Sequence, residues 1–159
     1  MDDRLYAFGA LRYEDDRFSG FDYQSSVALG VGYKFIDTET TKLAGRAGPG
    51  FRSLRQEVLI KDASGAVIQR IPGESQSDAV LTAGVDFMHA FNANTKVIDT
   101  FLAEAGSSNT SLQNDLALQV KMSEKLALSA GFGVRNNSKP PAGLKELDTT
   151  TTLNLVYGF

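Results

Sequence analysis

The charged residues of this chain are the first candidates for chemistry, because many of them recur at alternate positions of extended segments. One set shares a common face of these segments by this alternation: Asp78, Asp86, Asp99, Asp115, Arg46, Arg52, Lys121 and Arg135. Paired carboxylates can act as general acid and general base. Charges that are withdrawn from water must also be paired with one another. We interpret the set as a charge network that lines an enclosed interior, or lumen. In this network we expect Arg46 and Arg135 to meet Asp86, Asp99 or Asp115.

Nucleophilic and metal-dependent catalysis find little support in the composition. A Ser-His-acid arrangement would need His89, which is the only histidine. The alternation places His89 on the opposite face, between Phe87 and Phe91, where it belongs to an aromatic rim. The chain has no cysteine, which excludes a disulfide scaffold, a thiolate zinc site and a cysteine nucleophile. We therefore expect no catalytic residue, no cofactor, no metal and no enzymatic activity.

Eight segments with a period of two predict the strands that position these residues. They are Leu5–Glu14, Tyr23–Phe35, Lys42–Arg52, Ser77–His89, Thr95–Ala105, Leu112–Met122, Leu126–Arg135 and Thr149–Phe159. In most of them one face is apolar and the other is small or polar, as in a transmembrane strand between lipid and a narrow lumen. By this parity we expect the following side chains to face lipid: Val27, Leu29, Val31, Leu116, Leu118, Leu128, Phe132, Leu153 and Leu155.

Two segments depart from the simple pattern. In Thr95–Ala105 we expect Ile98, Thr100 and Leu102 to face outward, which leaves Phe101 facing inward. In Lys42–Arg52 the tripeptide 48–50 reads Gly-Pro-Gly, and proline has no N–H group to donate to a ladder. We expect a bulge or kink there, near the outer rim.

Length and composition limit the class of protein. The chain has 159 residues, which predicts a single domain over residues 1–159. No run approaches the roughly 20 consecutive apolar residues that a spanning helix requires. Because a bilayer admits only helices or closed barrels, a membrane-spanning form of this chain has to be a β-barrel. The formal net charge of -3 argues against nucleic acid as a partner.

The connections between the segments alternate in length. The short ones are Ile36–Thr41, Ala90–Asn94 and Ser123–Lys125, and the longer ones are Asp15–Asp22, Ser53–Gln76, Gly106–Ser111 and Asn136–Asp148. Outer-membrane barrels have short periplasmic turns and longer extracellular loops, so this order fits such a barrel. Within the longest connection, residues 57–68 predict a hairpin that extends the third and fourth strands.

The last segment ends on an aromatic residue. Leu155, Tyr157 and Phe159 share the apolar face of a strand that alternates back to Thr149. Terminal strands of outer-membrane barrels typically end in this way, and the barrel-assembly machinery recognises them. We therefore predict that the three residues form an assembly signal. The expected partners are this machinery during biogenesis and outer-membrane lipid thereafter.

Several stretches of the chain resemble the salt-induced outer membrane proteins, a family of bacterial β-barrels of unknown function. They are Asp16–Tyr23, Gly30–Glu39, Ala47–Arg52, Glu104–Thr110, Lys125–Leu128, and Asn136–Ser138 followed by Pro140-Pro141. The resemblance implies a Gram-negative outer-membrane location and carries no catalytic residues. Members usually have a signal peptide and further sequence before this point. The resemblance therefore also implies that Met1 is not the natural start and that the domain is N-terminally truncated.

The sequence thus predicts an all-β protein, an antiparallel up-and-down transmembrane β-barrel with about eight strands in this chain, in the cell outer membrane. Its expected role is structural or related to salt and osmotic stress, or that of a narrow pore. Two alternatives stay open, namely an outer-membrane enzyme acting on lipid or peptide and a soluble ligand-binding barrel of lipocalin type. Aliphatic faces turned inward would favour the soluble barrel.

Overall fold

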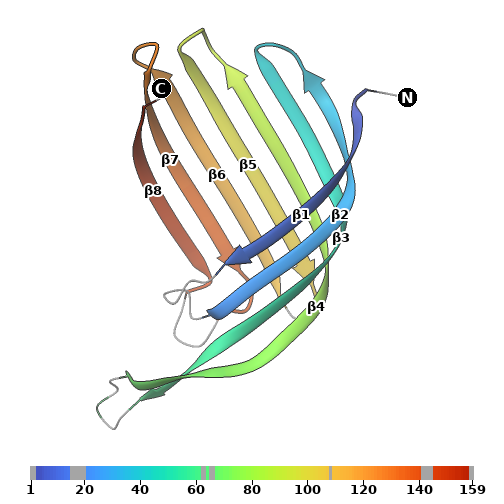
Figure 1. Cartoon of the computed structure of the whole chain (residues 1–159), viewed down its shortest axis with the longest axis vertical. Coiled ribbons are helices and arrows are strands. Elements are labelled where there is room, and N and C mark those ends of the chain that lie inside the picture. Colours follow the sequence, from blue (N-terminus) through green and yellow to red (C-terminus); the bar gives the residue numbers. More distant parts are fainter. Residues whose placement is uncertain are drawn as a thin grey trace.

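The computed structural model describes residues 3–14, 21–61, 64, 67–107, 109–140 and 145–157 of the 159-residue chain. The regular structure of these residues is all β-strand (Figure 1). The strands are β1 (Leu5–Glu14), β2 (Phe21–Asp37), β3 (Thr41–Lys61), β4 (Val67–Ala90), β5 (Thr95–Gly106), β6 (Thr110–Lys121), β7 (Leu126–Asn137) and β8 (Leu147–Tyr157). In this part of the chain, no helix has the length and hydropathy to cross a membrane.

The eight strands form a single antiparallel sheet in the order β1 to β8. Each strand pairs with its neighbours in the sequence, which confirms the predicted all-β, up-and-down arrangement. Among the described residues, no ladder joins β1 to β8, so these two strands are the edges of the sheet.

The sheet is strongly curled, and β1 passes in front of the central strands in Figure 1. One side-chain contact demonstrates the curl, because Arg12 Nη2 of β1 donates to Gln113 Oε1 of β6 at 3.2 Å. The two strands are not neighbours in the sheet, so this contact has to cross the inside of the curl. The fold is therefore a rolled sheet, with a concave inner face and a convex outer face.

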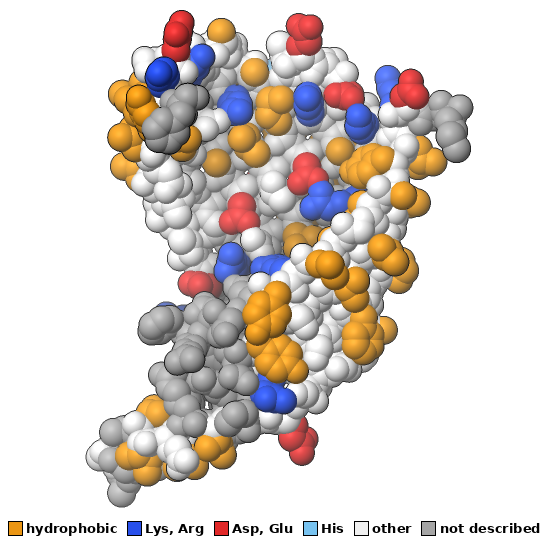
Figure 2. Space-filling model, viewed as in Figure 1, with side chains coloured by type: hydrophobic (Ala, Val, Ile, Leu, Met, Phe, Trp, Pro, Cys, Tyr) orange, Lys and Arg blue, Asp and Glu red, His pale blue; other side chains and the backbone are white. Residues whose placement is uncertain are grey.

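The polarity of the two faces is the reverse of that in most soluble proteins. In the described residues, the buried hydrophobic side chains are only Ala28, Leu54 and Val80, whereas Arg52 and Glu104 are among the buried polar ones. Figure 2 shows acidic and basic side chains in the hollow of the sheet and hydrophobic side chains along the outside of the band formed by β1 and β2. The inner face therefore carries most of the charged side chains, and the outer face is mostly apolar.

The side chains that the sequence places on the outer face do face outward. Exposed members of that set, up to 73% for Leu153, are Val27, Leu29, Val31, Leu116, Leu118, Phe132, Leu153 and Leu155. Leu128 is partly covered, but it is opposite Leu155 in the ladder and shares its face. The outward orientation is thus confirmed for the whole set, and the contact of these side chains with lipid stays a prediction.

The two ends of the sheet differ in their connections. We call the end with residues 38–40, 91–94 and 122–125 the turn end, and the opposite end the loop end. At the loop end, β3 and β4 project beyond the other strands (Figure 1), which confirms the expected hairpin extension. Of its tip, residues 62–63 and 65–66 lie outside the described residues.

The expected alternation of loop lengths fails between β5 and β6. This connection covers only residues 107–109 and is shorter than the turns 91–94 and 122–125. The strands continue farther than the residue types suggest, and Gly106 N donates to Asn109 O at 3.1 Å to close a tight turn.

The orientation expected for β5 is wrong. Directly opposite residues of antiparallel strands share a face. The register pairs Phe101 with the exposed Val85, so Phe101 faces outward. Ile98, Thr100 and Leu102 consequently face inward. Apolar side chains occupy both faces of β5, so residue type alone could not orient this strand.

Pro49 does not interrupt β3. The strand keeps its register with β4 through this segment, whereas its ladder with β2 lacks partners at residues 29–30. The two backbones approach closely here, and a Cβ built on Gly48 would lie 2.5 Å from Gly30 Cα. The structure has no kink at this point of β3. It has instead a gap in the ladder between β2 and β3, and this gap lies in the middle of the strand rather than at the outer rim.

This close approach predicts the effect of a single methyl group. Gly48→Ala should lower the free energy of unfolding by about 1–3 kcal/mol, because backbone atoms must move apart. Gly9→Ala is the matched control, since its Cβ would meet only the movable Leu29 Cδ2 at 3.2 Å. Urea titrations of both variants measure the difference. Equal stability of the two variants would contradict the close packing of β2 and β3.

Candidate functional site

The inner face of the rolled sheet brings together one of the ion pairs expected from the sequence. Arg46 of β3 donates from Nη1 to the carboxylate of Asp86 in β4. The residues are diagonal neighbours, because Arg46 is opposite Gly84 and Asp86 is opposite Ala44. Gly84 provides the space, since a Cβ there would lie 3.1 Å from Arg46 Nε. A long cation therefore lies over a glycine and reaches the carboxylate two positions away.

A second group of polar side chains crosses the interior. Arg12 donates to Gln113, and Gln113 Nε2 in turn donates to Asp115 Oδ2 at 2.5 Å. Asp115 is opposite Gly133, where a Cβ would lie 2.8 Å from Asp115 Oδ1. This chain of contacts joins β1 to β6 and narrows the interior at its level.

Arg52 is the largest fully buried side chain among the described residues, with 1% of its surface exposed. Its Nη2 donates to the backbone oxygen of Asn109 at 2.9 Å, and its Nη1 lies 3.9 Å from Glu104 Oε2. Within the described residues, Arg52 Nε and Nη1 and Thr82 Oγ1 have no hydrogen-bond partner. The buried guanidinium is therefore held by one hydrogen bond and by the charge of Glu104, which is also buried.

The contact with Asn109 makes Arg52 a link between three parts of the loop end. The backbone oxygen of Asn109 also accepts from Gly106 N within the turn. Its side-chain oxygen accepts from Ser138 Oγ at 2.9 Å and from Lys139 N at 3.1 Å. Through Asn109, Arg52 thus connects β3 to the β5–β6 turn and to the segment that follows β7.

Asp99 does not belong to this interior, and the expectation that it joins the charge network is wrong. It is opposite Phe87 in β4 and Leu116 in β6, both on the outer face. Its carboxylate accepts from Asn114 Nδ2 at 2.8 Å on that face. The misplacement has the same cause as the wrong orientation of β5, since Asp99 and Phe101 share one face.

Arg135 lies on the inner face, as expected, where it is a diagonal neighbour of Asp115, one of the carboxylates expected to meet it. It is opposite Gln113 in β6 and Asp148 in β8. Asp148 was not expected to lie in a strand, because the predicted segment begins at Thr149. The strand begins at Leu147 instead, which adds this carboxylate to the inner face.

Glu104 is the other acidic residue of the interior that sequence reasoning missed. The orientation expected for β5 turns Glu104 outward together with Ile98, Thr100 and Leu102, and it turns Asp99 and Phe101 inward. The register places Glu104 opposite Thr82, which shares the inner face of β4 with Asp78 and Asp86. The pairing of β4 with β5 was the signal that could have found it.

His89 lies on the outer face at the turn end, away from the interior carboxylates. Its Nδ1 is 2.8 Å from Thr41 Oγ1, and its ring meets Phe91 edge-on with centroids 5.0 Å apart. Across the described residues, no group of three or more His, Cys, Asp or Glu side chains could hold a metal ion. The chemistry that the interior supports is the pairing and solvation of charge.

The structure thus belongs to the class of rolled, all-antiparallel β-sheets with an apolar outer face and charges inside. The chain as a whole also matches one protein family. The model of the family described as "Protein of unknown function, DUF481" matches residues 1–159, and the chain belongs to that family. It is 26% identical over 159 residues to "Uncharacterized protein YdiY" from Escherichia coli (strain K12). The match covers 99% of this chain but 57% of that relative, so the chain spans little more than half of its length. No solved structure matches the chain.

The buried pair of Arg52 and Glu104 leads to a stability prediction. Arg52→Met leaves a buried carboxylate without its cation, and we expect it to lower the free energy of unfolding by about 3–5 kcal/mol. The double variant Arg52→Met/Glu104→Gln should regain part of this loss, because no charge stays buried. Urea unfolding of the three proteins measures the effect.

The control for this prediction is Arg55→Met on the same strand. Arg55 is only partly buried and donates to Ser75 Oγ at 3.1 Å. Its loss should change the free energy of unfolding by less than about 1 kcal/mol, as for other pairs near the surface. A double variant that is less stable than Arg52→Met alone would refute the charge-burial explanation.

Proposed function

We propose that this protein is an integral β-barrel of the Gram-negative outer membrane, with a narrow interior filled by charges. The observation that carries the proposal is the reversed polarity of the rolled sheet. Aliphatic and aromatic side chains are exposed over the outer face, whereas Arg46, Arg52 and Asp86 lie inside. An apolar surface of this extent makes a protein aggregate in water but is favourable against hydrocarbon.

Strand length and aromatic placement support the same proposal. The strands β5 to β8 have 11 or 12 residues, close to the 9–11 that a tilted membrane strand needs. On the outer face of β2, Val27, Leu29 and Val31 lie between Tyr23 at one end and the ring pair Tyr33 and Phe35 at the other. Aromatic residues at both ends of an aliphatic band are typical of strands that cross a bilayer.

The soluble-barrel alternative requires the opposite arrangement. A ligand-binding barrel of lipocalin type would place its aliphatic faces inside, and here they lie outside. For an outer-membrane enzyme, the Thr41 hydroxyl and the His89 imidazole are a hydroxyl–base pair, but they lie on the outer face beside Phe91, and among the described residues no carboxylate contacts His89. We therefore propose a non-catalytic role, structural or related to salt and osmotic stress. The stress-related part rests on the sequence resemblance to salt-induced outer membrane proteins.

The proposal also requires partners for the two edge strands. In a bilayer, the free backbone groups of β1 and β8 must be paired, with each other or with further strands. An exposed edge is also a template on which another chain can add a strand, so β8 is the surface on which the barrel-assembly machinery would act. Its outward side chains Leu155 and Tyr157 are exposed, and Phe159 lies outside the described residues.

The membrane location predicts a depth-dependent cost of charge on the outer face. Leu29→Arg should lower the free energy of unfolding in lipid vesicles by about 2–4 kcal/mol, because Leu29 lies in the middle of the aliphatic band. Tyr23→Arg, at the edge of that band, should cost about 0–1 kcal/mol. Urea titrations in vesicles measure both values. Equal costs at the two positions would argue against a bilayer around β2.

The narrow interior predicts little ion flow. In planar bilayers we expect no large, stable conductance, because Arg12, Gln113 and Asp115 cross the interior. Arg12→Ala should raise the current by removing this contact, whereas Lys139→Ala at the loop end should leave it unchanged. A large open conductance of the unaltered protein would refute the filled interior and favour a porin.

A further inference from the structure

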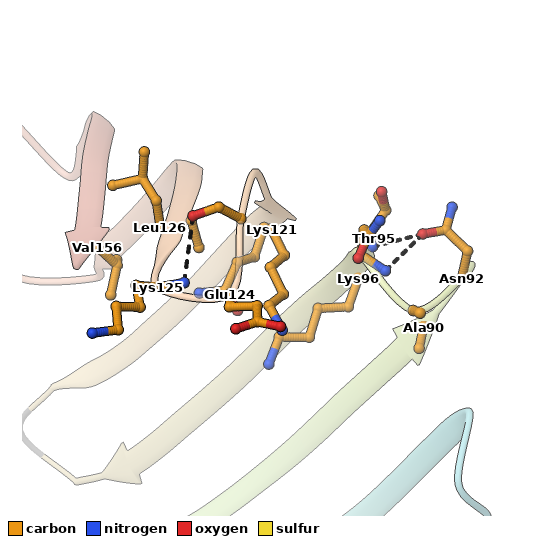
Figure 3. Close-up of a pocket in the computed structure, with 14 residues that line it drawn as sticks. Ala90, Asn92, Thr95, Lys96, Lys121, Glu124, Lys125, Leu126 and Val156 are labelled. Atoms are coloured by element: carbon orange, nitrogen blue, oxygen red, sulfur yellow. Dashed lines mark hydrogen bonds between the residues drawn. The ribbon is translucent and has the colours of Figure 1, made fainter. Parts of the chain in front are cut away.

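The turn end of the inner face holds a second cluster of charged side chains, which includes Lys121 of the expected charge network. A cavity of about 400 Å³ opens there, between the turns 91–94 and 122–125 and the strands beside them (Figure 3). The small apolar side chains of Ala90, Ala127 and Val156 form part of its wall. Three lysines, Lys96, Lys121 and Lys125, also line it, and we call it the lysine cavity.

Two of these lysines share one face of neighbouring strands. Lys96 of β5 is opposite Gln119, and Lys121 lies two residues farther along β6. They are therefore diagonal neighbours, which brings long side chains within reach of a single bound group. In Figure 3 both side chains extend toward the same region beside Glu124.

The lysine cavity has more cations than anions. Glu124 is the one acidic residue among those that line it, against three lysines. Within the described chain, none of the three ammonium groups forms an ion pair, whereas Lys34 at the same end is paired with Asp37 at 3.1 Å. The excess positive charge is therefore available to a ligand.

We propose that the lysine cavity binds a small solute that carries a phosphate group. A phosphate dianion has three terminal oxygens and can accept from the ammonium groups of Lys96 and Lys121 on the two neighbouring strands. A monocarboxylate would leave half of the excess positive charge uncompensated.

The size and position of the cavity limit the ligand further. Its volume lies within the range of small-molecule sites, and its apolar wall can accept an organic part beside the phosphate. The strand residues Lys96, Lys121 and Ala127 belong to the inner face by register. A lipid headgroup at the outer face does not reach them, so the phosphate belongs to a free solute. This inference goes beyond the structural role proposed above, and its exclusion of a lipid headgroup rests on the proposed membrane location.

Isothermal titration calorimetry of the purified protein in detergent micelles tests the proposal, with glycerol 3-phosphate, lactate and glycerol as probes. We expect saturable binding of glycerol 3-phosphate, at least about tenfold weaker binding of lactate, and none of glycerol. Lys96→Gln/Lys121→Gln should weaken glycerol 3-phosphate binding at least about tenfold. Lys139→Gln makes a like charge change at the loop end and should alter it by less than about twofold.

In the calorimetry, three results would overturn the proposal: no saturable binding, equal affinity for lactate, or a loss in Lys96→Gln/Lys121→Gln no greater than that in the Lys139→Gln control. Competition by phosphatidylglycerol micelles as strong as that by glycerol 3-phosphate would assign the site to a lipid headgroup and overturn the free-solute assignment. Circular dichroism checks that each variant keeps its sheet. A phosphorus NMR titration of the unaltered protein needs no variant, and a phosphate resonance that neither shifts nor broadens would also overturn the proposal.

Discussion

The hydrogen-bonded ladder between neighbouring antiparallel strands is the constraint on which the rest of this structure depends. It decides which face each residue occupies, because directly opposite residues point the same way. One register sets Arg46 beside Asp86 and Glu104 opposite Thr82. A slip by one residue would turn the aliphatic side chains inward and the charges outward. The apolar outside and the charged inside are therefore two results of one set of backbone pairings.

Curling the sheet adds a second requirement, which is space for long polar side chains on the concave face. An eight-stranded sheet that closes on itself leaves an interior just wide enough for side chains to fill. Glycines supply the missing room at two of the charged positions, Gly84 under Arg46 and Gly133 beside Asp115. At these two positions the interior is thus packed by placing a charged side chain over a glycine, which has no side chain. This arrangement explains why few of the buried side chains are hydrophobic.

The two ends of the interior differ in whether their charged side chains are buried and paired. At the loop end, Arg52 is buried, associated with Glu104 and bonded to Asn109, which ties three segments together. At the turn end, Lys96 and Lys121 line a cavity without a carboxylate partner in the described chain. Charge that is paired and buried holds the fold, and charge that is unpaired and accessible is free to bind. The interior therefore combines a closed structural half with an open half that can accept a ligand.

The sequence by itself determined the strands, their order along the chain and the outward face of most of them. That information is local, because alternation along one strand shows directly which residues share a side. It sufficed for β2, where one face is aliphatic and the other is small or polar, and it failed for β5, where both faces carry apolar side chains. The fold class was predictable for this reason, and the orientation of Phe101 and Asp99 was not.

Only the tertiary structure decided which charges meet. Alternation predicted that Arg46 and Arg135 point inward, but partner choice depends on the register between strands and on the curl of the sheet. Glu104 entered the site through the pairing of β5 with β4, and Asp148 through an earlier start of β8. The contact between Arg12 and Gln113 joins residues 101 positions apart in the chain. No local pattern encodes such a contact, because it exists only once hydrogen bonds between all the intervening strands have rolled the sheet.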